Sequence, residues 1–140
     1  MNKVKAIICD LDGTLCLFKH HRGPYDASKC SDDLPNKVVI SILKRFQRTH
    51  TLIFVSERSS EYREQTEGWI YKHVKPKNRC RLFMREEGDN RRDSIVKQEI
   101  FDNYIKGDYD IFFVLDDRNQ VVDMWRSNGF VCLQVADGNF

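Results

Sequence analysis

Two aspartates near the start of the chain are the residues best placed for chemistry. Asp10 and Asp12 belong to the run Asp-Leu-Asp-Gly-Thr at residues 10–14, which follows an apolar segment, residues 4–9, that predicts a β-strand. Both carboxylates are expected to leave the end of that strand in the same direction. Two acids this close repel each other unless a cation lies beside them, and Mg²⁺ is the usual partner. The alternative is an acidic turn without function, which a position directly after a buried strand disfavours.

Two further polar motifs also follow predicted strands. Ser56 comes after residues 51–55, and Asp116 and Asp117 come after residues 111–115. Segments of helical periodicity separate the strands, so we expect an α/β fold with a mostly parallel sheet and helices on both faces. The carboxyl ends of parallel strands lie at one edge of the sheet, where ligands bind. The three motifs are therefore predicted to converge on one site.

Hydrophobic periodicity and turn residues set the expected boundaries. Residues 11–34 read as a long loop that could contain a short hairpin, and Pro35 is placed in the first turn of the next helix, with Asp33 or Leu34 near its cap. Trp69 and Trp125 are expected in the core. Strands are expected at residues 3–9, 51–55, 81–84, 111–115 and 130–135, and helices at residues 35–46, 60–74, 95–105 and 121–129.

The composition indicates one domain, residues 1–140, in a reducing compartment. The chain has a net charge of +2 and five cysteines, with no C-x-x-C pair. Buried free thiols explain this odd count better than a disulfide framework or a zinc site. The sequence contains no apolar run long enough to span a bilayer and no signal-peptide pattern, so we expect a cytoplasmic protein without a membrane partner.

Gathered at one edge of a sheet, these residues suit phosphoryl transfer. Asp10 is the candidate nucleophile that forms an aspartyl-phosphate, and Asp12 the candidate general acid and then base. Asp116 and Asp117 are expected to hold Mg²⁺ together with them, although this pair could instead cap the next helix. Lys97 could equally be a solvated helix lysine. The candidate phosphate ligands are Thr14 and Ser56, with Arg58, Arg85 and Lys97 as the cations.

Several longer runs resemble a known family. The motifs Asp-x-Asp-Gly-Thr, Ser56, Lys97 and Asp116-Asp117 are similar to those of the haloacid dehalogenase (HAD) superfamily of phosphotransferases. A closer resemblance is to the phosphatase domain of the bacteriophage-type polynucleotide kinase/3′-phosphatase family, and it covers nearly the whole chain. The runs that carry it are residues 22–26 (Arg-Gly-Pro-Tyr-Asp), 28–30, 54–56, 85–89, 96–101 and 116–126.

The resemblance implies a Rossmann-like HAD fold and Mg²⁺-dependent removal of phosphate from polynucleotide ends. That family acts on 3′-phosphates of RNA or DNA, and on 2′,3′-cyclic phosphates of RNA, in nucleic-acid repair. The resemblance implies that Asp10 is the nucleophile, Asp12 the general acid, and Arg22 a substrate contact. A further alternative is a partner-dependent subunit whose kinase or ligase is encoded separately. The residues implied to hold the phosphate or its approach are Ser56, Arg58, Arg85 and Lys97.

Two features depart from the family pattern. Glu57 stands between Ser56 and Arg58, where the family often has glycine. Its carboxylate would repel a phosphate, so we expect it to point away from the site. The phosphate-binding loop G-x-x-x-x-G-K-[ST] does not occur in the 140 residues. The family's kinase half is therefore absent, which indicates either a free-standing phosphatase or an excised domain.

Motif spacing and local charge favour a large substrate. Only 44 positions lead from Asp12 to Ser56, and 39 from Arg58 to Lys97, which leaves no room for a large cap domain. Residues 75–92 hold seven lysines and arginines against three acids, and a basic cluster at residues 19–22 adds to them. Such a patch can bind a phosphate backbone, although it could also be a solvated face. The alternatives are a phosphatase of small metabolites and a non-catalytic module that binds phosphorylated ends.

Overall fold

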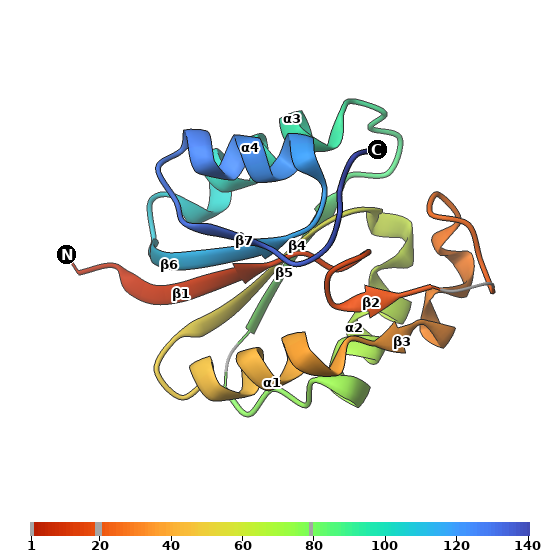
Figure 1. Cartoon of the computed structure of the whole chain (residues 1–140), viewed down its shortest axis with the longest axis horizontal. Helices are drawn as coiled ribbons and strands as arrows, with labels where there is room; N and C mark the ends of the chain where they lie inside the picture. The colour runs from red at the N-terminus through yellow and green to blue at the C-terminus, as the bar shows by residue number, and fades with distance from the viewer. Residues whose placement is uncertain (1, 19–20, 79) are drawn as a thin grey trace.

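Five parallel strands form the central sheet, in the order β5-β4-β1-β6-β7 (Figure 1). The computed structural model describes residues 2–18, 21–78 and 80–140. Strands β1 and β6 are buried on both faces along their carboxyl-terminal halves, and β4 is buried from Leu52 to Ser56, which explains their uninterrupted apolar runs. The expected parallel α/β sheet is confirmed. The strands are β1 (Val4–Cys9), β4 (Thr51–Ser59), β5 (Cys80–Arg85), β6 (Tyr109–Asp116) and β7 (Cys132–Gln134).

Helices cover both faces of the sheet (Figure 1). One face packs against α1 (Lys37–Phe46) and α2 (Arg63–His73). The other face packs against α3 (Asp93–Ile100), the π-helical turn η3 (Phe101–Ile105) and α4 (Asn119–Ser127). Successive side chains of β1 divide between the two cores, because neighbours along a strand point to opposite faces. Ile7 therefore packs with α1 and α2, whereas Ile8 packs with α3 and α4.

The predicted core aromatics and free thiols are confirmed. The exposed fractions of Trp69 and Trp125 are 3% and 0%. All five cysteines lie in the described part of the chain and are free. Burial raises the pKa of Cys132 to about 12, which makes that thiol unreactive. Among the described residues, no helix combines the length and the apolar character needed to cross a membrane.

The start of α1 differs from the prediction. The N-cap is Asn36, whose side chain accepts from the Val39 amide, so the caps predicted at Asp33 or Leu34 are wrong. Pro35 is not helical. It lies in β3 (Leu34–Pro35), which pairs antiparallel with β2 (Cys16–Leu17), so the loop does contain a short two-stranded element. The remaining short elements are the 3₁₀ helices η1 (Ala27–Asp32) and η2 (Ser60–Tyr62).

The strand order places a ligand crevice beside β1. The chain leaves β1 through α1 on one face, and it reaches β6 through α3 on the other. The direction of winding therefore reverses at β1, and open α/β sheets bind ligands outside the carboxyl ends of the strands at such a point. Between β1 and β4 the described residues add only short elements and α1. No large cap domain covers the crevice in this part of the chain.

Candidate active site

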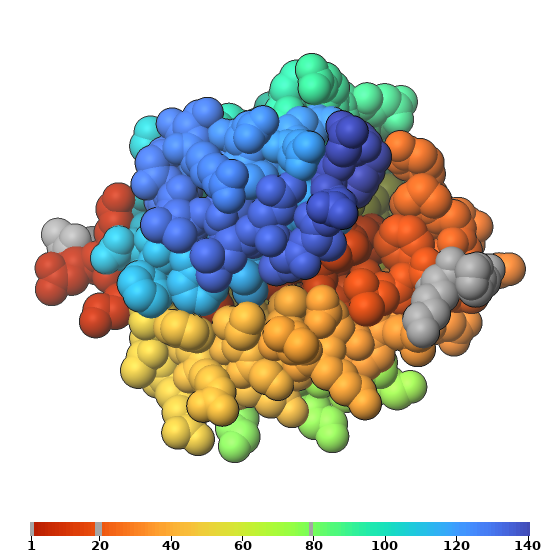
Figure 2. Space-filling view, viewed as in Figure 1, coloured from red at the N-terminus to blue at the C-terminus, as the bar shows by residue number. Residues whose placement is uncertain are grey.

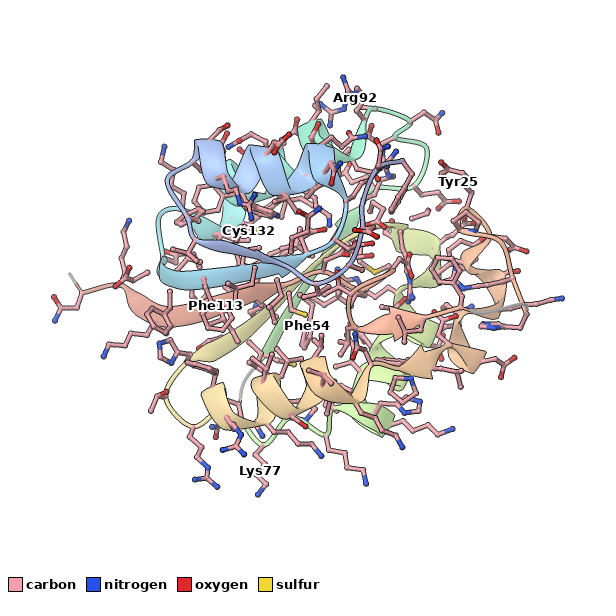
Figure 3. All side chains as sticks on the ribbon, viewed as in Figure 1. Tyr25, Phe54, Lys77, Arg92, Phe113 and Cys132 are labelled. Carbon is pink, nitrogen blue, oxygen red and sulfur yellow. The ribbon has the colours of Figure 1, made fainter. Side chains whose placement is uncertain are left out.

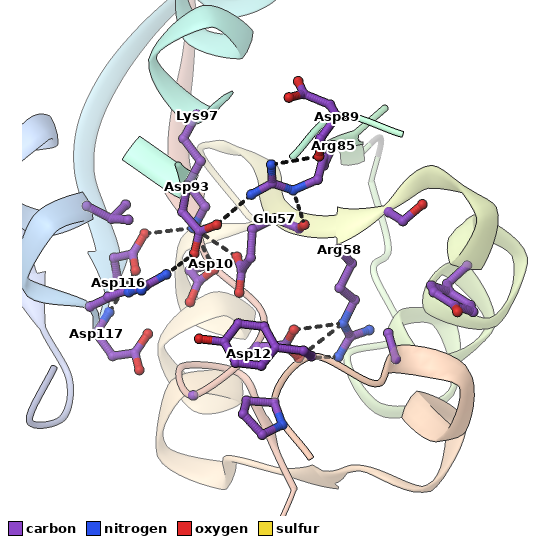
Figure 4. A pocket seen from close by; sticks show the side chains of 18 of the residues that line it. Asp10, Asp12, Glu57, Arg58, Arg85, Asp89, Asp93, Lys97, Asp116 and Asp117 are labelled. Carbon is purple, nitrogen blue, oxygen red and sulfur yellow. Dashed lines mark hydrogen bonds and ion pairs between the residues drawn. The ribbon is translucent and has the colours of Figure 1, made fainter. Parts of the chain in front are cut away.

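Three buried carboxylates meet at the carboxyl ends of β1 and β6. Asp10 directly follows β1, Asp116 ends β6, and Asp117 comes next. One oxygen from each lies within 4.8 Å of the others, and the three residues are 2–4% exposed. The predicted convergence of these strand ends therefore occurs (Figure 4). Because the carboxylates face one another inside the molecule, helix capping does not explain their positions.

Lys97 is the cation of this cluster. It projects from α3, is 1% exposed, and its Nζ donates to Asp10 Oδ1 at 2.7 Å and to Asp116 Oδ2 at 3.1 Å. Burial alone would lower the pKa of Lys97, but the neighbouring carboxylates outweigh it and raise that pKa well above the ordinary value. The alternative of a solvated helix lysine is therefore wrong.

The charge of the cluster is not balanced by Lys97 alone. Burial and the charge of Asp116 raise the pKa of Asp10 well above its ordinary value, and burial likewise raises the pKa of Asp117. A buried group of three carboxylates beside one ammonium needs further positive charge. Oxygen ligands in this number suit a hard divalent cation such as Mg²⁺. Asp10, Asp116 and Asp117 therefore fit a Mg²⁺ site, whereas the carboxylate of Asp12 lies outside this group.

Thr14 and Gly13 support the carboxylates. The Thr14 hydroxyl is fully buried and lies 3.0 Å from Asp10 Oδ2 and 3.2 Å from Asp117 Oδ1, and it can donate to one of them at a time. Thr14 therefore orients these acids rather than facing a phosphate. Gly13 has φ +83°, and a Cβ at this position would lie 2.2 Å from Asp117 Oδ2. Only glycine lets the loop approach Asp117 so closely.

We expect Gly13→Ala to disturb the cluster, with Gly88→Ala as the matched control. Both glycines have positive φ, but a Cβ at Gly88 would meet nothing within 4 Å. The control should lose about 1 kcal/mol in the free energy of unfolding, from backbone conformation alone. Gly13→Ala should lose about 1–3 kcal/mol more, because the methyl group forces Asp117 aside. Equal losses in denaturant titrations would show that Asp117 does not depend on this close approach.

Asp12 is held by two arginines. Its Oδ1 accepts from Arg22 Nη2 at 2.7 Å and from Arg58 Nη2 and Nε at 2.6 and 3.0 Å. Its Oδ2 accepts from Arg58 Nε at 3.2 Å. Oδ2 therefore has the fewer contacts and is the oxygen better placed to exchange a proton in the cavity. The structure thus brings Arg22 and Arg58 to the site as predicted, but it places them against the carboxylate of Asp12, the candidate general acid.

Arg22 and Arg58 form a clamp around Asp12, and Asp33 completes it. Sequence reasoning missed Asp33. It is 3% exposed and accepts from Arg22 Nε and Nη2 and from Arg58 Nη2, each at 2.8 Å. The ring of His21 lies 2.8 Å from Asp33 Oδ1. Asp33 thereby fixes both guanidinium groups from behind. Asp33 follows no predicted strand and belongs to no spaced motif, so no pattern in the sequence indicates its role.

Arg85 organises the opposite wall together with Asp93, a second residue that sequence reasoning missed. Arg85 Nε donates to the backbone oxygen of Glu57 at 2.8 Å, and its Nη2 donates to Asp93 Oδ1 at 2.5 Å. Its Nη1 donates to backbone oxygens of Asp89 and Arg91. Asp93 also forms an ion pair with Arg118. Arg85 lines the cavity, but these contacts hold the loop after β5 in place.

Ser56 and Glu57 occupy the end of β4 in different ways. Ser56 is fully buried, and its Oγ accepts from the Arg58 amide at 3.1 Å, which shapes the turn. The carboxylate of Glu57 faces the cavity, and its Oε2 lies 3.4 Å from Lys97 Nζ (Figure 4). The prediction that Glu57 points away is wrong, because the buried ammonium of Lys97 attracts its carboxylate.

The catalytic candidates share one cavity of about 620 Å³. Asp10, Asp12, Lys97, Asp116 and Asp117 all line it. Phe140 of the carboxyl-terminal segment lines one side, and Figure 2 shows this segment in dark blue next to the paler blue residues of α4, where the Asn119 amide donates to the Gly138 oxygen. Aromatic side chains also contribute to the wall, namely Phe18, Tyr25, Tyr62 and Phe140.

The model of the polynucleotide kinase PNKP phosphatase domain family matches residues 4–140. The chain belongs to this family. It is also 37% identical, over 125 residues, to the "Putative bifunctional polynucleotide kinase/RNA ligase" of Autographa californica nuclear polyhedrosis virus. That alignment covers 87% of this chain and 18% of the viral protein.

Solved structures support the assignment to the PNKP phosphatase family. A chain in the "Structure of the Pnkp1/Rnl/Hen1 RNA repair complex" has a TM-score of 0.92 and 44% identity, and a chain in the "Structure of Pnkp1/Rnl/Hen1 complex" has 0.92 and 45%. Both matches cover 99% of this chain, but 44% and 48% of the solved chains. The chain therefore spans less than half the length of the relatives described here. It has the HAD-type fold of a polynucleotide kinase phosphatase domain.

The basic patch predicted for residues 75–92 does not form one surface beside the PNKP-type site. Lys77 lies beside the end of α1, where its amide donates to Gln47, and Figure 3 shows it far from Tyr25 and Arg92. Strand β5 separates the basic residues before it, such as Lys77, from those after it, such as Arg92, and places them at opposite ends of the strand. Arg79, Lys19 and His20 lie outside the described residues. This part of the prediction is wrong, because charges close in sequence are separated by the length of a strand.

Proposed function

We propose that the chain is a Mg²⁺-dependent polynucleotide 3′-phosphatase that acts through an aspartyl-phosphate on Asp10. The observation that carries the proposal is the placement of Asp10. Its carboxylate leaves the central strand at the switch point of the sheet, bonds to Lys97 and Thr14, and faces the cavity that Asp12 also lines. A nucleophile and a proton-transfer group are thus held on one short loop.

In the first step, a carboxylate oxygen of Asp10 attacks the phosphorus of the terminal phosphate. The bond between phosphorus and the 3′-oxygen breaks, its electron pair passes to that oxygen, and Asp12 supplies a proton to it. In the second step, water attacks the phosphorus and gives a proton to Asp12, and the bond to Asp10 breaks. The products are inorganic phosphate and a 3′-hydroxyl end, with Asp10 again a carboxylate and Asp12 again protonated.

The clamp on Asp12 and the cation beside Asp10 support these steps. Arg22 and Arg58 fix the Asp12 carboxylate, so it needs little reorganisation when a proton moves. Lys97 orients Asp10 Oδ1 and lies where charge develops on the transferring phosphoryl group. Mg²⁺ held by Asp10, Asp116 and Asp117 would neutralise phosphate charge during transfer.

Family membership and the uncapped cavity support a polynucleotide end as substrate rather than a small metabolite. A cavity without a large lid can take a chain terminus whose remaining nucleotides extend into solvent. The aromatic wall residues offer faces on which bases can stack. The product has a 3′-hydroxyl, which a ligase requires, so we propose a separately encoded kinase or ligase as the functional partner. The proposed unit is a single phosphatase domain over residues 1–140.

A comparison of substrate lengths tests this proposal. Phosphate release should be measured on a 3′-phosphorylated oligonucleotide and on a nucleoside 3′-monophosphate, each with Mg²⁺ and with a chelator. We expect kcat/KM to be about tenfold or more higher on the oligonucleotide, because extra nucleotides add phosphate and stacking contacts. Turnover should disappear with the chelator. Equal rates on both substrates, or faster release from a sugar phosphate, would favour a metabolite phosphatase instead.

A further inference from the structure

Glu57 occupies a position that the proposed mechanism does not use. Its carboxylate lies inside the cavity that contains Asp10 and Asp12, with the side chain 24% exposed. Its backbone oxygen accepts from Arg85 Nε at 2.8 Å, so the residue is anchored at the end of β4. The side chain is therefore directed at the reaction site by a fixed backbone (Figure 4).

The ammonium of Lys97 has three donors, and three carboxylates surround it. Two donate to Asp10 and Asp116, which belong to the nucleophile and the acid cluster. The third side faces Glu57 Oε2 at 3.4 Å, the longest of the three ion pairs. A phosphate oxygen that contacts Lys97 must therefore replace Glu57, because the other two acids are needed where they are.

We propose that Glu57 is a specificity-determining residue whose carboxylate competes with the phosphate for Lys97 and so selects for singly charged phosphoryl groups. This inference rests on the proposed phosphatase function. A terminal phosphomonoester carries nearly two negative charges at neutral pH, whereas a 2′,3′-cyclic phosphate is a diester with one. Repulsion from a fixed carboxylate grows in proportion to the ligand charge, so Glu57 penalises the monoester and inorganic phosphate more.

Two arms test the proposal, with Glu57→Gln as the variant and Glu61→Gln as the control. Glutamine keeps the shape of Glu57 and removes its charge. Glu61 also lines the cavity, but it lies on η2, and no ion pair joins it to Lys97 in the described part of the chain. The first arm measures binding of inorganic phosphate by calorimetry in the presence of Mg²⁺. The second measures kcat/KM on oligonucleotides that end in a 3′-phosphate or in a 2′,3′-cyclic phosphate.

We expect Glu57→Gln to bind inorganic phosphate about tenfold more tightly, and Glu61→Gln to change binding less than about twofold. The ratio of kcat/KM for cyclic over monoester ends should fall about tenfold in Glu57→Gln, mainly through KM for the monoester. Unchanged phosphate binding in Glu57→Gln, or an equal change in Glu61→Gln, would overturn the proposal. The binding arm needs no polynucleotide turnover, so it decides about Glu57 even if neither substrate is hydrolysed and the proposed function fails.

Discussion

Replacing Asp10 with asparagine should abolish phosphate release while leaving the fold intact. The amide keeps the shape of the carboxylate and can still accept from Lys97, but it cannot form an acyl phosphate. We expect turnover on a 3′-phosphorylated oligonucleotide to fall by about 10⁴-fold or more, as for other catalytic nucleophiles. The measurement is steady-state phosphate release with Mg²⁺.

The melting temperature of Asp10→Asn provides a second readout, which should not fall although turnover does. Burial and the charge of Asp116 raise the pKa of Asp10, so its ionised form is disfavoured in the folded state. The penalty grows as pH rises above the ordinary pKa of an aspartate. At neutral pH the neutral asparagine should therefore leave the melting temperature unchanged or raise it. Asp123→Asn, on the exposed side of α4, is the control and should affect neither property. Retained turnover in Asp10→Asn would contradict the covalent mechanism.

Removing Arg58 should cause the largest loss of stability among the site residues. The Arg58 side chain is 1% exposed, and its guanidinium donates to Asp12 and Asp33 and, at 3.2 Å, to the hydroxyl of Thr66. Arg58→Ala would leave two buried carboxylates facing each other with only Arg22 between them. Breaking a buried ion pair from one side costs about 3–5 kcal/mol in the free energy of unfolding.

Denaturant titration of three variants checks the prediction for Arg58. Arg58→Lys keeps the charge but loses the planar fork, so its loss should be intermediate. Arg48→Ala removes an exposed arginine at the end of α1 and should change stability by less than about 0.5 kcal/mol. Turnover by Arg58→Lys should also fall, since Asp12 is no longer fixed. A loss below about 1 kcal/mol in Arg58→Ala would show that the clamp is not a structural unit.

Residues at strand ends could be predicted because the topology follows from the pattern of elements. Asp10 and Asp116 lie far apart in sequence, yet both follow apolar strands, and parallel strands place their carboxyl ends at one edge. The pairing of β1 with β6 brings these aspartates together. The site around them therefore follows from local sequence and a general rule of sheet topology.

Residues that act through side-chain networks could not be predicted in this way. Asp33 and Asp93 come from loops or helix starts, and their roles depend on which arginine reaches them in the folded chain. The position of Glu57 could not be predicted from its repulsion of a phosphate, because in the folded chain the attraction of its carboxylate to Lys97 decides where it points. The basic patch does not follow from charge counted along the chain for a related reason, since a strand separates Lys77 from Arg92 (Figure 3).

The most direct test of the central claim is to trap the covalent intermediate. The protein should be mixed with an oligonucleotide carrying a labelled 3′-phosphate in the presence of Mg²⁺, quenched in acid within milliseconds, and analysed by peptide mapping. We expect one acid-stable phosphoryl label on the peptide that contains Asp10, formed before free phosphate appears and absent in Asp10→Asn. Full turnover without any labelled peptide, or a label on a different residue, would contradict it.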